Sequence, residues 1–512
     1  MNLAGPVRYW GRRMPERIAF RMDDKIVTWR ELDERTSRLA QGLAGLGVGL
    51  GDRVALLTTN CIEFCEVVLA CFKLGAIVVP LNYRLVPREL QEILQRSGAT
   101  RVMGHGDLVS PLIDHVGDEA GWQATVIAVP GQLHDNLAGL PDMETLIAGS
   151  PPIDPMAVFA PAHPAVICYT SGTTGQPKGA VLSHRNVMGT AMERMTCDEW
   201  NSSDVGYIPY AIAFTGGLVS MWMPLYVAGS QTVLDASFDA ERTLRLIAEL
   251  KITAFIAVGS VLIALAASPG FESADLTSLT TLATGGSPIP VELIRQFERK
   301  GLRLAQQYGL TEGGGLNLIL PADQAVSRIG SAGLPTPQCL AKVVRPDLEE
   351  CGVDEVGELI LRGPQCMEHY WNDDEATAGA VLDGWLYTGD LARFDADGYF
   401  TIVDRKKDML ISGGINIYPA EIERVLAEFE ALEELAVIAV PHARWGEVPV
   451  IVGRARSETS EQEILGFCRE RLGRYKVPKR AILRDEPLPR GMSGKVLKRT
   501  LREEYANVEV GD

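Results

Sequence analysis

Residues 169–184 read YTSGTTGQPKGAVLSH, in which three glycines and five serine or threonine residues surround Lys178. This stretch is too polar and too rich in glycine for a core strand or a helix interior. Glycines allow consecutive backbone N–H groups to turn toward one oxygen atom, and the hydroxyls and Lys178 add further donors and a positive charge. The loop therefore fits a polyphosphate-binding site, although a Ser/Thr/Gly turn taken alone is most often an ordinary surface loop. It is not a Walker A motif, because two residues separate Gly175 from Lys178 and Gly179 follows.

Short β-branched runs alternate with a longer helical pattern on both sides of this loop. The runs at 53–59, 76–81, 165–170 and 253–259 are typical of buried strands, and residues 28–47 carry leucines along one helical face. Such alternation predicts an α/β fold, with a large N-terminal domain of helix-covered, mainly parallel sheets.

The pattern changes after residue 392, where a hairpin is expected around Asp397-Gly398, followed by the charge run 404–407. A small α+β domain is expected beyond it, with helices at 419–430 and 460–473 and strands near 435–441 and 448–454. We therefore predict an N-terminal domain at 1–403, a hinge at 404–408 and a C-terminal domain at 409–512.

Composition narrows the class of protein. The chain has 512 residues, 46% hydrophobic and 22% charged, which indicates a soluble globular protein of at least two domains. The first residues show no secretory signal, so a cytoplasmic location is expected. Neither the nine cysteines nor the seven histidines have zinc-site spacing. Despite a net charge of −17, residues 469–499 hold eleven basic and three acidic side chains, which would attract an anionic ligand or form a solvated surface.

Two segments, 205–234 and 252–271, contain no Lys, Arg or Glu. Their length would permit membrane spans, but prolines and glycines break the first, and neither has clustered basic residues beside it. Buried strand-loop-helix units of a large core are the favoured interpretation.

The loop at 169–184 also resembles the phosphate-binding signature of the adenylate-forming superfamily, in its acyl- and aryl-CoA synthetase branch of AMP-forming acid–thiol ligases. Six further motifs that resemble this family follow in order: QQYGLTE (306–312), GELILRG (357–363), GWLYTGD (384–390), DRKKD (404–408), SGGINIYPAEIE (412–423) and PRGMSGKV (489–496). The resemblance spans almost the whole chain and implies a large adenylation domain followed by a mobile C-terminal domain.

The resemblance implies that Tyr308 stacks on adenine, Thr311 contacts phosphate and Glu312 binds Mg²⁺. A carboxylate among phosphates needs a hard cation between them, and Mg²⁺ typically takes one or two protein carboxylates. The implied catalytic residues are Lys495, Glu312 and Thr174. The implied ATP or AMP contacts are Thr170, Ser171, Gly172, Thr173, Thr174, Gly175, Lys178, Gly285, Gly286, Ser287, Gln307, Tyr308, Gly309, Thr311, Asp390, Arg405 and Lys495.

In this resemblance Asp390 accepts both ribose hydroxyls, Arg405 reaches the same ribose, and Lys407 is the hinge residue. Lys495 is expected to act in catalysis, because an ammonium between the substrate carboxylate and the ATP α-phosphate reduces their repulsion and stabilises the transition state.

The implied reaction has two halves. A carboxylate and MgATP form an acyl-adenylate and pyrophosphate, and a thiol then yields a thioester and AMP. A family-typical rotation would bring residues 412–414 to the thiol's tunnel, where Gly414 leaves room for pantetheine. The expected coenzyme A contacts are Ser412, Gly413, Gly414, Arg474 and Lys476.

The acyl pocket is expected to include Phe214, Thr215, Gly217, Val258, Gly259, Ile263 and Gly285. The chain departs from the family here, with Ala211, Ile212 and Phe214 where a histidine is usual, and Gly259 in place of a proline. Neither an aspartate for a substrate ammonium nor an arginine for a second carboxylate is present in these segments. We therefore expect a monocarboxylic acid with an uncharged fatty, branched, cyclic or aromatic tail.

The sequence favours free coenzyme A as the acceptor, since no carrier domain follows Lys495 in the chain. A carrier protein, a luciferase-like oxidation and a non-catalytic nucleotide-binding protein remain alternatives. The joint presence of Thr174, Glu312, Asp390 and Lys495 speaks against the last. ATP, coenzyme A and a small carboxylic acid are the expected partners, with no nucleic acid and no membrane span, and the oligomeric state stays open.

Overall fold

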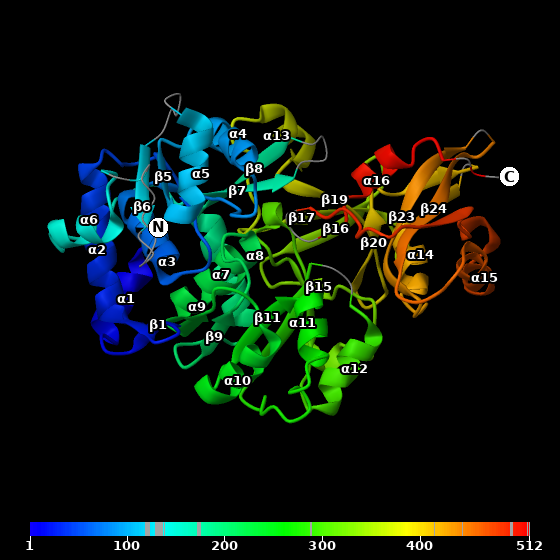
Figure 1. Cartoon of the computed structure of the whole chain (residues 1–512), viewed down its shortest axis with the longest axis horizontal. Coiled ribbons are helices and arrows are strands. Elements are labelled where there is room, and N and C mark those ends of the chain that lie inside the picture. Colours follow the sequence, from blue (N-terminus) through cyan, green and yellow to red (C-terminus); the bar gives the residue numbers. More distant parts are fainter. Residues whose placement is uncertain are drawn as a thin grey trace. The chain divides into compact units, whose positions relative to one another are not determined.

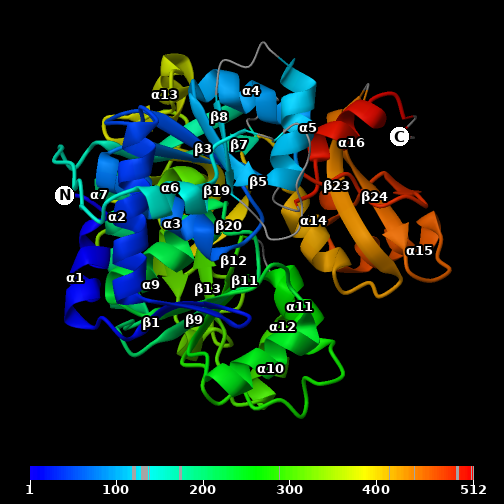
Figure 2. The same cartoon turned by 60° about the vertical axis from the view of Figure 1, so that its left-hand side comes forward.

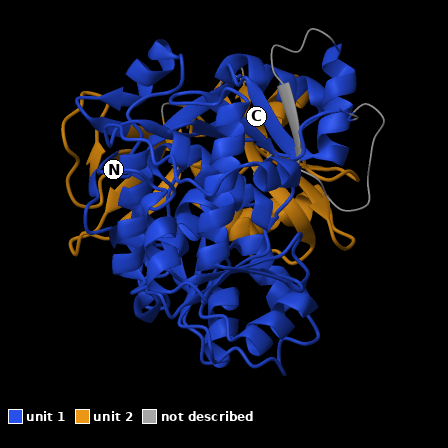
Figure 3. Cartoon of the chain, turned by 90° about the vertical axis from the view of Figure 1, so that its left-hand side faces the viewer, with its two compact units in different colours: residues 1–341, 361–386 blue, residues 342–360, 387–512 orange. Residues whose placement is uncertain are grey.

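The computed structural model describes residues 1–117, 123–127, 137, 139–171, 176–286, 289–413, 415–442, 444–491, 495–508 and 510 (Figure 1). The chain forms two compact units, coloured separately in Figure 3. Unit 1 contains residues 1–341 and 361–386, and unit 2 contains residues 342–360 and 387–512. The mixed α/β architecture with large, mainly parallel sheets agrees with the fold predicted from the sequence.

The glycine-hydroxyl stretch connects two antiparallel strands and a helix. Strand β7 (Pro164–Ser171) pairs with β8 (Pro177–Ser183), and Thr170 lies opposite Lys178. Helix α7 (His184–Cys197) follows at once, because the Ser183 hydroxyl accepts a hydrogen bond from the Asn186 backbone N–H and so caps the first turn. The intervening residues 172–175 lie outside the described part of the chain.

A six-stranded sheet contains this pair, in the order β6-β5-β3-β4-β7-β8, and it is parallel except for β7 with β8. Helices α4 and α5 lie side by side against it and bury an apolar cluster with β3, β4 and β5 (Figure 2). The predicted strands at 53–59, 76–81 and 165–170 are confirmed. The bounds are β3 Arg53–Leu57, α3 Ile62–Leu74, β4 Ile77–Pro80, α4 Pro87–Ser97, β5 Arg101–His105, α5 Gly106–Val116, β6 Gln123–Ile127 and α6 Met143–Gly149.

A nine-stranded sheet has the order β15-β14-β13-β12-β11-β9-β10-β1-β2, with parallel pairing from β13 through β1. Helices α10, α11 and α12, green in Figure 1, pack on one of its faces around Phe255, Phe271 and Phe297. The bounds are β1 Ile18–Met22, β2 Lys25–Thr28, β9 Val205–Ile208, β10 Gln231–Leu234, α10 Ala240–Leu250, β11 Ala254–Val258, α11 Gly259–Ala266, β12 Thr281–Gly285, α12 Val291–Arg299, β13 Ala305–Tyr308, β14 Leu318–Leu320 and β15 Leu334–Pro335.

The two apolar segments of the sequence belong to this sheet and its covering helices. Residues 205–234 form β9, the short α8 (Thr215–Gly217), the π-helical turn η3 (Leu218–Trp222), α9 (Met223–Ala228) and β10. Trp222 and Tyr226 of this segment are fully buried. Among the described residues, no helix is long and apolar enough to cross a membrane. The interpretation as core units is confirmed.

Helix α2 (Trp29–Gly45) confirms the predicted helix at 28–47, and its start is fixed by a capping box between Thr28 and Glu31. Helix α1 (Gly5–Arg13) packs beside it. Ion pairs join α2 to α3. Arg35 forms two hydrogen bonds to the fully buried Glu66, at 2.6 and 2.9 Å, and the fully buried Lys73 lies 2.7 Å from Asp33.

Unit 2 has a five-stranded sheet in which β24 (Gly446–Ala455) pairs with β21 (Leu410–Ser412), β23 (Leu432–His442) and β25 (Arg480–Leu483). One face packs on α14 (Pro419–Leu426) and α15 (Glu461–Arg471), and the other on α16 (Lys498–Glu504). The predicted helix at 419–430 is shorter than expected, because α14 ends at Leu426 and β23 begins at Leu432. The remaining described elements of the two units are β16 Leu340–Val344, β17 Gly357–Arg362, α13 Asp374–Ala380, β18 Val381–Leu382, β19 Trp385–Phe394, β20 Phe400–Arg405, β22 Ile415–Ile417 and the 3₁₀ turns η4 Thr311–Gly313, η5 Ala322–Gln324 and η6 Arg474–Lys476.

The expected hairpin around Asp397-Gly398 is present, because β19 and β20 pair antiparallel and Gly398 has a φ of +82° in the turn. The division between the compact units at residue 387 falls within β19, the first strand of this hairpin, whereas the sequence places the hinge at 404–408. The boundary at residue 387 reflects which residues pack together, whereas a hinge is defined by the movement of one domain against another. The hinge at 404–408 therefore stays a prediction.

The ion pair between Arg35 and Glu66 generates a stability prediction. Arg35→Met should lower the free energy of unfolding by about 3 kcal/mol, because the Glu66 carboxylate would stay buried without its partner. Arg30→Met on the same helix is the control, since the Arg30–Glu16 pair has side chains 61% and 79% exposed and should contribute less than about 1 kcal/mol. Urea unfolding checks both, and equal losses would contradict the prediction.

Candidate functional site

The β7–β8 pair positions Thr170 and Lys178 at the base of the predicted phosphate loop. The Thr170 hydroxyl donates to the Lys178 carbonyl oxygen at 3.4 Å. The Lys178 ammonium lies 5.4 Å from the centroid of the Tyr370 ring, a cation–π distance. Among the other predicted loop residues, Gly172, Thr173, Thr174 and Gly175 lie outside the described residues, as does the Ser171 side chain.

The YGLTE motif turns sharply after β13. A Cβ atom on Gly309 would lie 2.3 Å from the carbonyl oxygen of Gly315, so a side chain there would collide with backbone. Beyond this turn, the Thr215 hydroxyl donates to the Thr311 hydroxyl at 3.1 Å. Tyr308, Thr311 and Glu312, predicted to bind nucleotide and metal, are all partly exposed.

Glu312 is held from two sides. The Tyr370 hydroxyl donates to Glu312 Oε1 at 2.8 Å, and the Met367 backbone N–H donates to the Glu312 carbonyl oxygen at 2.7 Å. Burial and the neighbouring carboxylate raise the pKa of Tyr370 above its usual range, so the phenol stays protonated and acts as the donor. Glu312 Oε2 has no hydrogen-bond partner among the described residues, so it could bind a cation such as Mg²⁺, which typically takes one or two protein carboxylates.

Sequence reasoning missed Tyr370. Nothing around MEHYWND marks this tyrosine as a site residue, and the separation of 58 residues from Glu312 gives no local signal. A bridge between Tyr370 and Ala180 brings it beside β8. Tyr370 therefore links the phosphate loop to the predicted metal carboxylate.

The predicted acyl-pocket residues lie at the carboxyl ends of neighbouring strands. Val258 on β11 pairs with Gly285 on β12, and Val258 and Ile263 are 48% and 46% exposed, which is high for large apolar side chains. Gly259 begins α11, and Gly286 has a φ of +87°. Ser287 lies outside the described residues.

The other part of the predicted acyl pocket precedes η3. Phe214 precedes α8, and Thr215 is buried within it. Packing explains the glycine at position 217, because a Cβ atom there would lie 2.7 Å from Ile212 Cα. Thr215 therefore connects the predicted acyl pocket to Thr311 of the nucleotide motif.

Unit 2 carries a second group of predicted nucleotide residues. Asp390 on β19 lies opposite Arg405 on β20, and Arg405 Nε is 2.6 Å from Asp390 Oδ1. The Asp390 side chain is 4% exposed and that of Arg405 is 44% exposed. The strand register thus places the two predicted ribose contacts side by side.

Lys495 lies in the same unit, and the charges of Arg405 and Asp390 influence its pKa. Partial loss of hydration lowers the pKa of Lys495, nearby Arg405 and Lys407 lower it further, and Asp390 opposes the change. The side chain as a whole remains exposed, so the loss of hydration is local. Burial likewise lowers the pKa of Lys407. Residues 492–494 of the PRGMSGKV motif lie outside the described residues.

The predicted coenzyme A residues differ in their surroundings. Gly413 has a φ of +57° and donates its N–H to the Trp445 carbonyl oxygen at 2.8 Å, while Ser412 ends β21. Arg474 is exposed, whereas Lys476 pairs with Glu421 at 2.5 Å. Gly414 lies outside the described residues. Binding of coenzyme A by these residues therefore stays a prediction.

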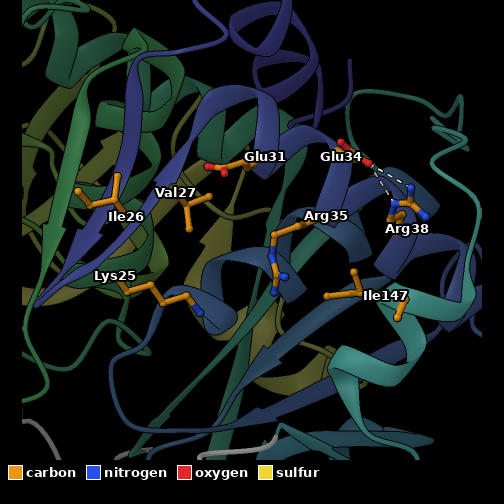
Figure 4. Close-up of a pocket in the computed structure, with 9 residues that line it drawn as sticks. Lys25, Ile26, Val27, Glu31, Glu34, Arg35, Arg38 and Ile147 are labelled. Carbon is orange, nitrogen blue, oxygen red and sulfur yellow. Dashed lines mark hydrogen bonds and ion pairs between the residues drawn. The ribbon is translucent and has the colours of Figure 1, made fainter.

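A hollow lined by residues of β2, α2 and α6 contains none of these predicted site residues in its lining (Figure 4). Its charged lining is already paired, with Arg35 bound to Glu66 and Glu144, Arg38 bound to Glu34, and Lys25 bound to Glu63. We assign no ligand to it.

The residues predicted to bind the nucleotide therefore fall into two groups, one in each compact unit. The family model described as AMP-binding enzyme matches residues 7–371, and that of the AMP-binding enzyme C-terminal domain matches residues 421–495. The chain belongs to the AMP-binding enzyme family, in the acid–CoA ligase branch of the adenylate-forming superfamily.

Two relatives and two solved structures illustrate the similarity. Feruloyl-CoA synthase of an Amycolatopsis species is 37% identical over 98% of both chains, and indoleacetate–CoA ligase of Aromatoleum aromaticum is 36% identical over 96% of this chain and 95% of its own. The o-succinylbenzoate CoA synthetase of Bacillus subtilis with its acyl-adenylate intermediate has a TM-score of 0.88 at 30% identity, covering 99% of each chain. The same synthetase with ATP and magnesium has a TM-score of 0.87 at 30% identity, covering 97% of this chain and 99% of its own.

The Tyr370–Glu312 hydrogen bond generates a prediction about metal binding. Tyr370→Phe keeps the ring beside Lys178 but removes the donor, so the Mg²⁺ concentration for half-maximal pyrophosphate release should rise about 10-fold. Binding of Mn²⁺ in the presence of ATP, followed by electron paramagnetic resonance, should weaken in parallel. Tyr370→Leu removes the ring as well and should also weaken ATP binding; an unchanged metal dependence in Tyr370→Phe would contradict the role of the hydroxyl.

Proposed function

We propose that the chain is an ATP-dependent carboxylic acid–CoA ligase that works through an acyl-adenylate. In the first half-reaction a carboxylate oxygen of the acid attacks the α-phosphorus of ATP, and the bond to pyrophosphate breaks. In the second, the coenzyme A thiol attacks the acyl carbon, the bond to AMP breaks, and the thiol proton is lost to solvent.

The observation that carries this proposal is the group around Glu312. Tyr370 fixes one oxygen of the carboxylate, Thr311 lies one residue away with its hydroxyl bonded to Thr215, and Lys178 stands over the ring of the same tyrosine. These donors and the carboxylate together suit a polyphosphate with its cation. Mg²⁺, when bound at Glu312, would neutralise charge on the phosphates.

The residues of unit 2 receive the complementary roles. Asp390 has two oxygens for the two ribose hydroxyls, and Arg405 beside it supplies donors. We assign Lys495 to the α-phosphate and the substrate carboxylate, where its ammonium stabilises the negative charge that develops as they react. Ser412, Gly413, Gly414, Arg474 and Lys476 are assigned to coenzyme A, and Lys407 to the hinge.

We infer that the substrate is a monocarboxylic acid with an uncharged tail. Val258, which stands opposite Gly285, and Ile263 both expose apolar surface, and residues 252–271 carry no charged side chain that could pair with a second ionic group. Relatives named for ferulate, indoleacetate and long-chain fatty acids are consistent with this class.

A cytoplasmic location is also proposed, since all nine cysteines are free thiols.

The test is a panel of carboxylic acids of rising length and ring size, each supplied with ATP and Mg²⁺, with and without coenzyme A. Acid-dependent pyrophosphate release shows adenylation, and AMP formed only with coenzyme A shows thioester formation. ATP binding without release for every acid would favour a non-catalytic nucleotide-binding protein. Thioester transfer to a carrier protein in place of coenzyme A would favour the carrier-dependent alternative.

Lys495→Ala should separate the two half-reactions. Pyrophosphate release should fall by about 100-fold or more, because the transition state loses its counter-charge. Conversion of supplied acyl-adenylate and coenzyme A into thioester should change by less than about threefold. Equal losses in both half-reactions would contradict the role given to Lys495, and Lys498→Ala serves as a control for basic charge on the adjacent helix.

The lowered pKa of Lys495 also predicts a pH dependence. The ammonium is present below this pKa, so adenylation should decline as the pH rises, with a midpoint below the usual lysine value of 10.5. Lys495→Arg stays protonated and should lose this alkaline decline even if its maximal rate is lower. An identical alkaline decline in both proteins would show that another group controls it.

A further inference from the structure

Gln307 lies where the predicted acyl pocket borders the nucleotide motif. It stands opposite Gly285 on the neighbouring strand, and Gly285 in turn stands opposite Val258. Residues in register on paired strands share a face of the sheet, so Gln307, Gly285 and Val258 face the same way, whereas Gln306 faces the opposite way. The family resemblance assigns Gln307 to ATP, and this register also sets it beside the predicted acyl pocket.

Arg194 of α7 fixes the orientation of the Gln307 amide. The Arg194 side chain is 1% exposed, and its Nη2 donates to Gln307 Oε1 at 3.0 Å. A guanidinium group has only donors, so the amide oxygen of Gln307 must point to Arg194 and the amide nitrogen must point away from it. Gln307 therefore presents a donor.

That donor has no partner among the described residues. Gln307 Nε2 is buried from solvent and has no acceptor within the part of the chain that the structure describes. A buried N–H group without an acceptor is costly, and native proteins rarely leave one so. An acceptor atom on a bound substrate would satisfy it.

The charges around this amide decide what kind of acceptor fits. Arg194 forms an ion pair with Asp198 at 2.7 Å, and the Asp198 side chain is 6% exposed, so the buried pair is neutral as a unit. A second carboxylate on the substrate tail would arrive without a free counter-charge and would be costly to bury. An ether, carbonyl or hydroxyl oxygen accepts a hydrogen bond without that cost.

We propose that Gln307 is a specificity-determining residue and that the preferred substrate carries an uncharged acceptor oxygen on its tail, at the depth of the Gln307 amide. This inference rests on the proposed acid–CoA ligase function and narrows its substrate class. A plain hydrocarbon tail of the same shape leaves the amide N–H unsatisfied and reacts more slowly. Arg194 acts as a positioning residue that keeps the nitrogen turned toward the tail.

The first test uses the unaltered enzyme and matched pairs of acids. Each pair exchanges one oxygen for a methylene group, such as methoxyphenyl against ethylphenyl propanoates with para and meta substitution, and ether-containing against all-methylene alkanoates with the oxygen at successive positions. At least one oxygen-bearing acid should exceed its partner by about tenfold in kcat/KM for pyrophosphate release, in the range expected for an unsatisfied buried donor. Activation of the acids with no preference in any pair would overturn the inference while leaving the ligase function intact. Failure of every acid to release pyrophosphate would count against the ligase function itself.

The second test removes the amide. Gln307→Leu should reduce kcat/KM for the preferred oxygen-bearing acid about tenfold and change that of its methylene partner by less than about threefold, so the preference disappears. Gln307→Met provides a second variant of similar size if the first does not fold. Gln306→Leu removes an amide from the opposite face of the same strand and should retain the preference. Retention of the preference in both Gln307 variants, or its equal loss in Gln306→Leu, would overturn the assignment.

Discussion

The hydrogen bond from Tyr370 to Glu312 is the interaction on which the candidate site depends. A carboxylate beside a polyphosphate loop would repel its ligand unless its position and its charge were controlled. Tyr370 holds one oxygen of Glu312 at 2.8 Å, and its ring lies beside Lys178 of β8, so one side chain joins the two parts of the phosphate site. In the proposed site a cation would bind the other carboxylate oxygen of Glu312 and offset its repulsion from the phosphates.

Each compact unit contributes a different kind of chemistry. Unit 1 supplies hydroxyls, one carboxylate and the apolar surface around Val258, which suit binding of phosphates and of an acyl tail. Unit 2 sets Asp390 and Arg405 side by side through the register of β19 and β20 and places Lys495 in their field. The proposed reaction needs both sets, because one positions the leaving group and the other stabilises charge at the reacting phosphorus.

The proposed substrate class follows from two features of unit 1: exposed apolar side chains in the predicted acyl pocket, and a buried ion pair whose two charges cancel. Apolar residues at Val258 and Ile263 favour a hydrocarbon tail, while the neutral Arg194–Asp198 pair disfavours a second charge. Among the described residues of this predicted wall, the Gln307 amide nitrogen is a buried donor without an acceptor, and Arg194 fixes the way it points. Specificity would then come from one satisfied hydrogen bond within an otherwise apolar pocket.

The sequence by itself determined the fold class, the family and the local motifs around Lys178, Glu312, Asp390 and Lys495. These features are local, because strand periodicity, glycine turns and charge spacing act over a few residues. Only the tertiary structure decided that Tyr370 binds Glu312 and that Arg194 orients Gln307, since these pairs lie 58 and 113 residues apart. Strand register and helix packing bring such residues together, and neither can be read from neighbouring residues in the chain.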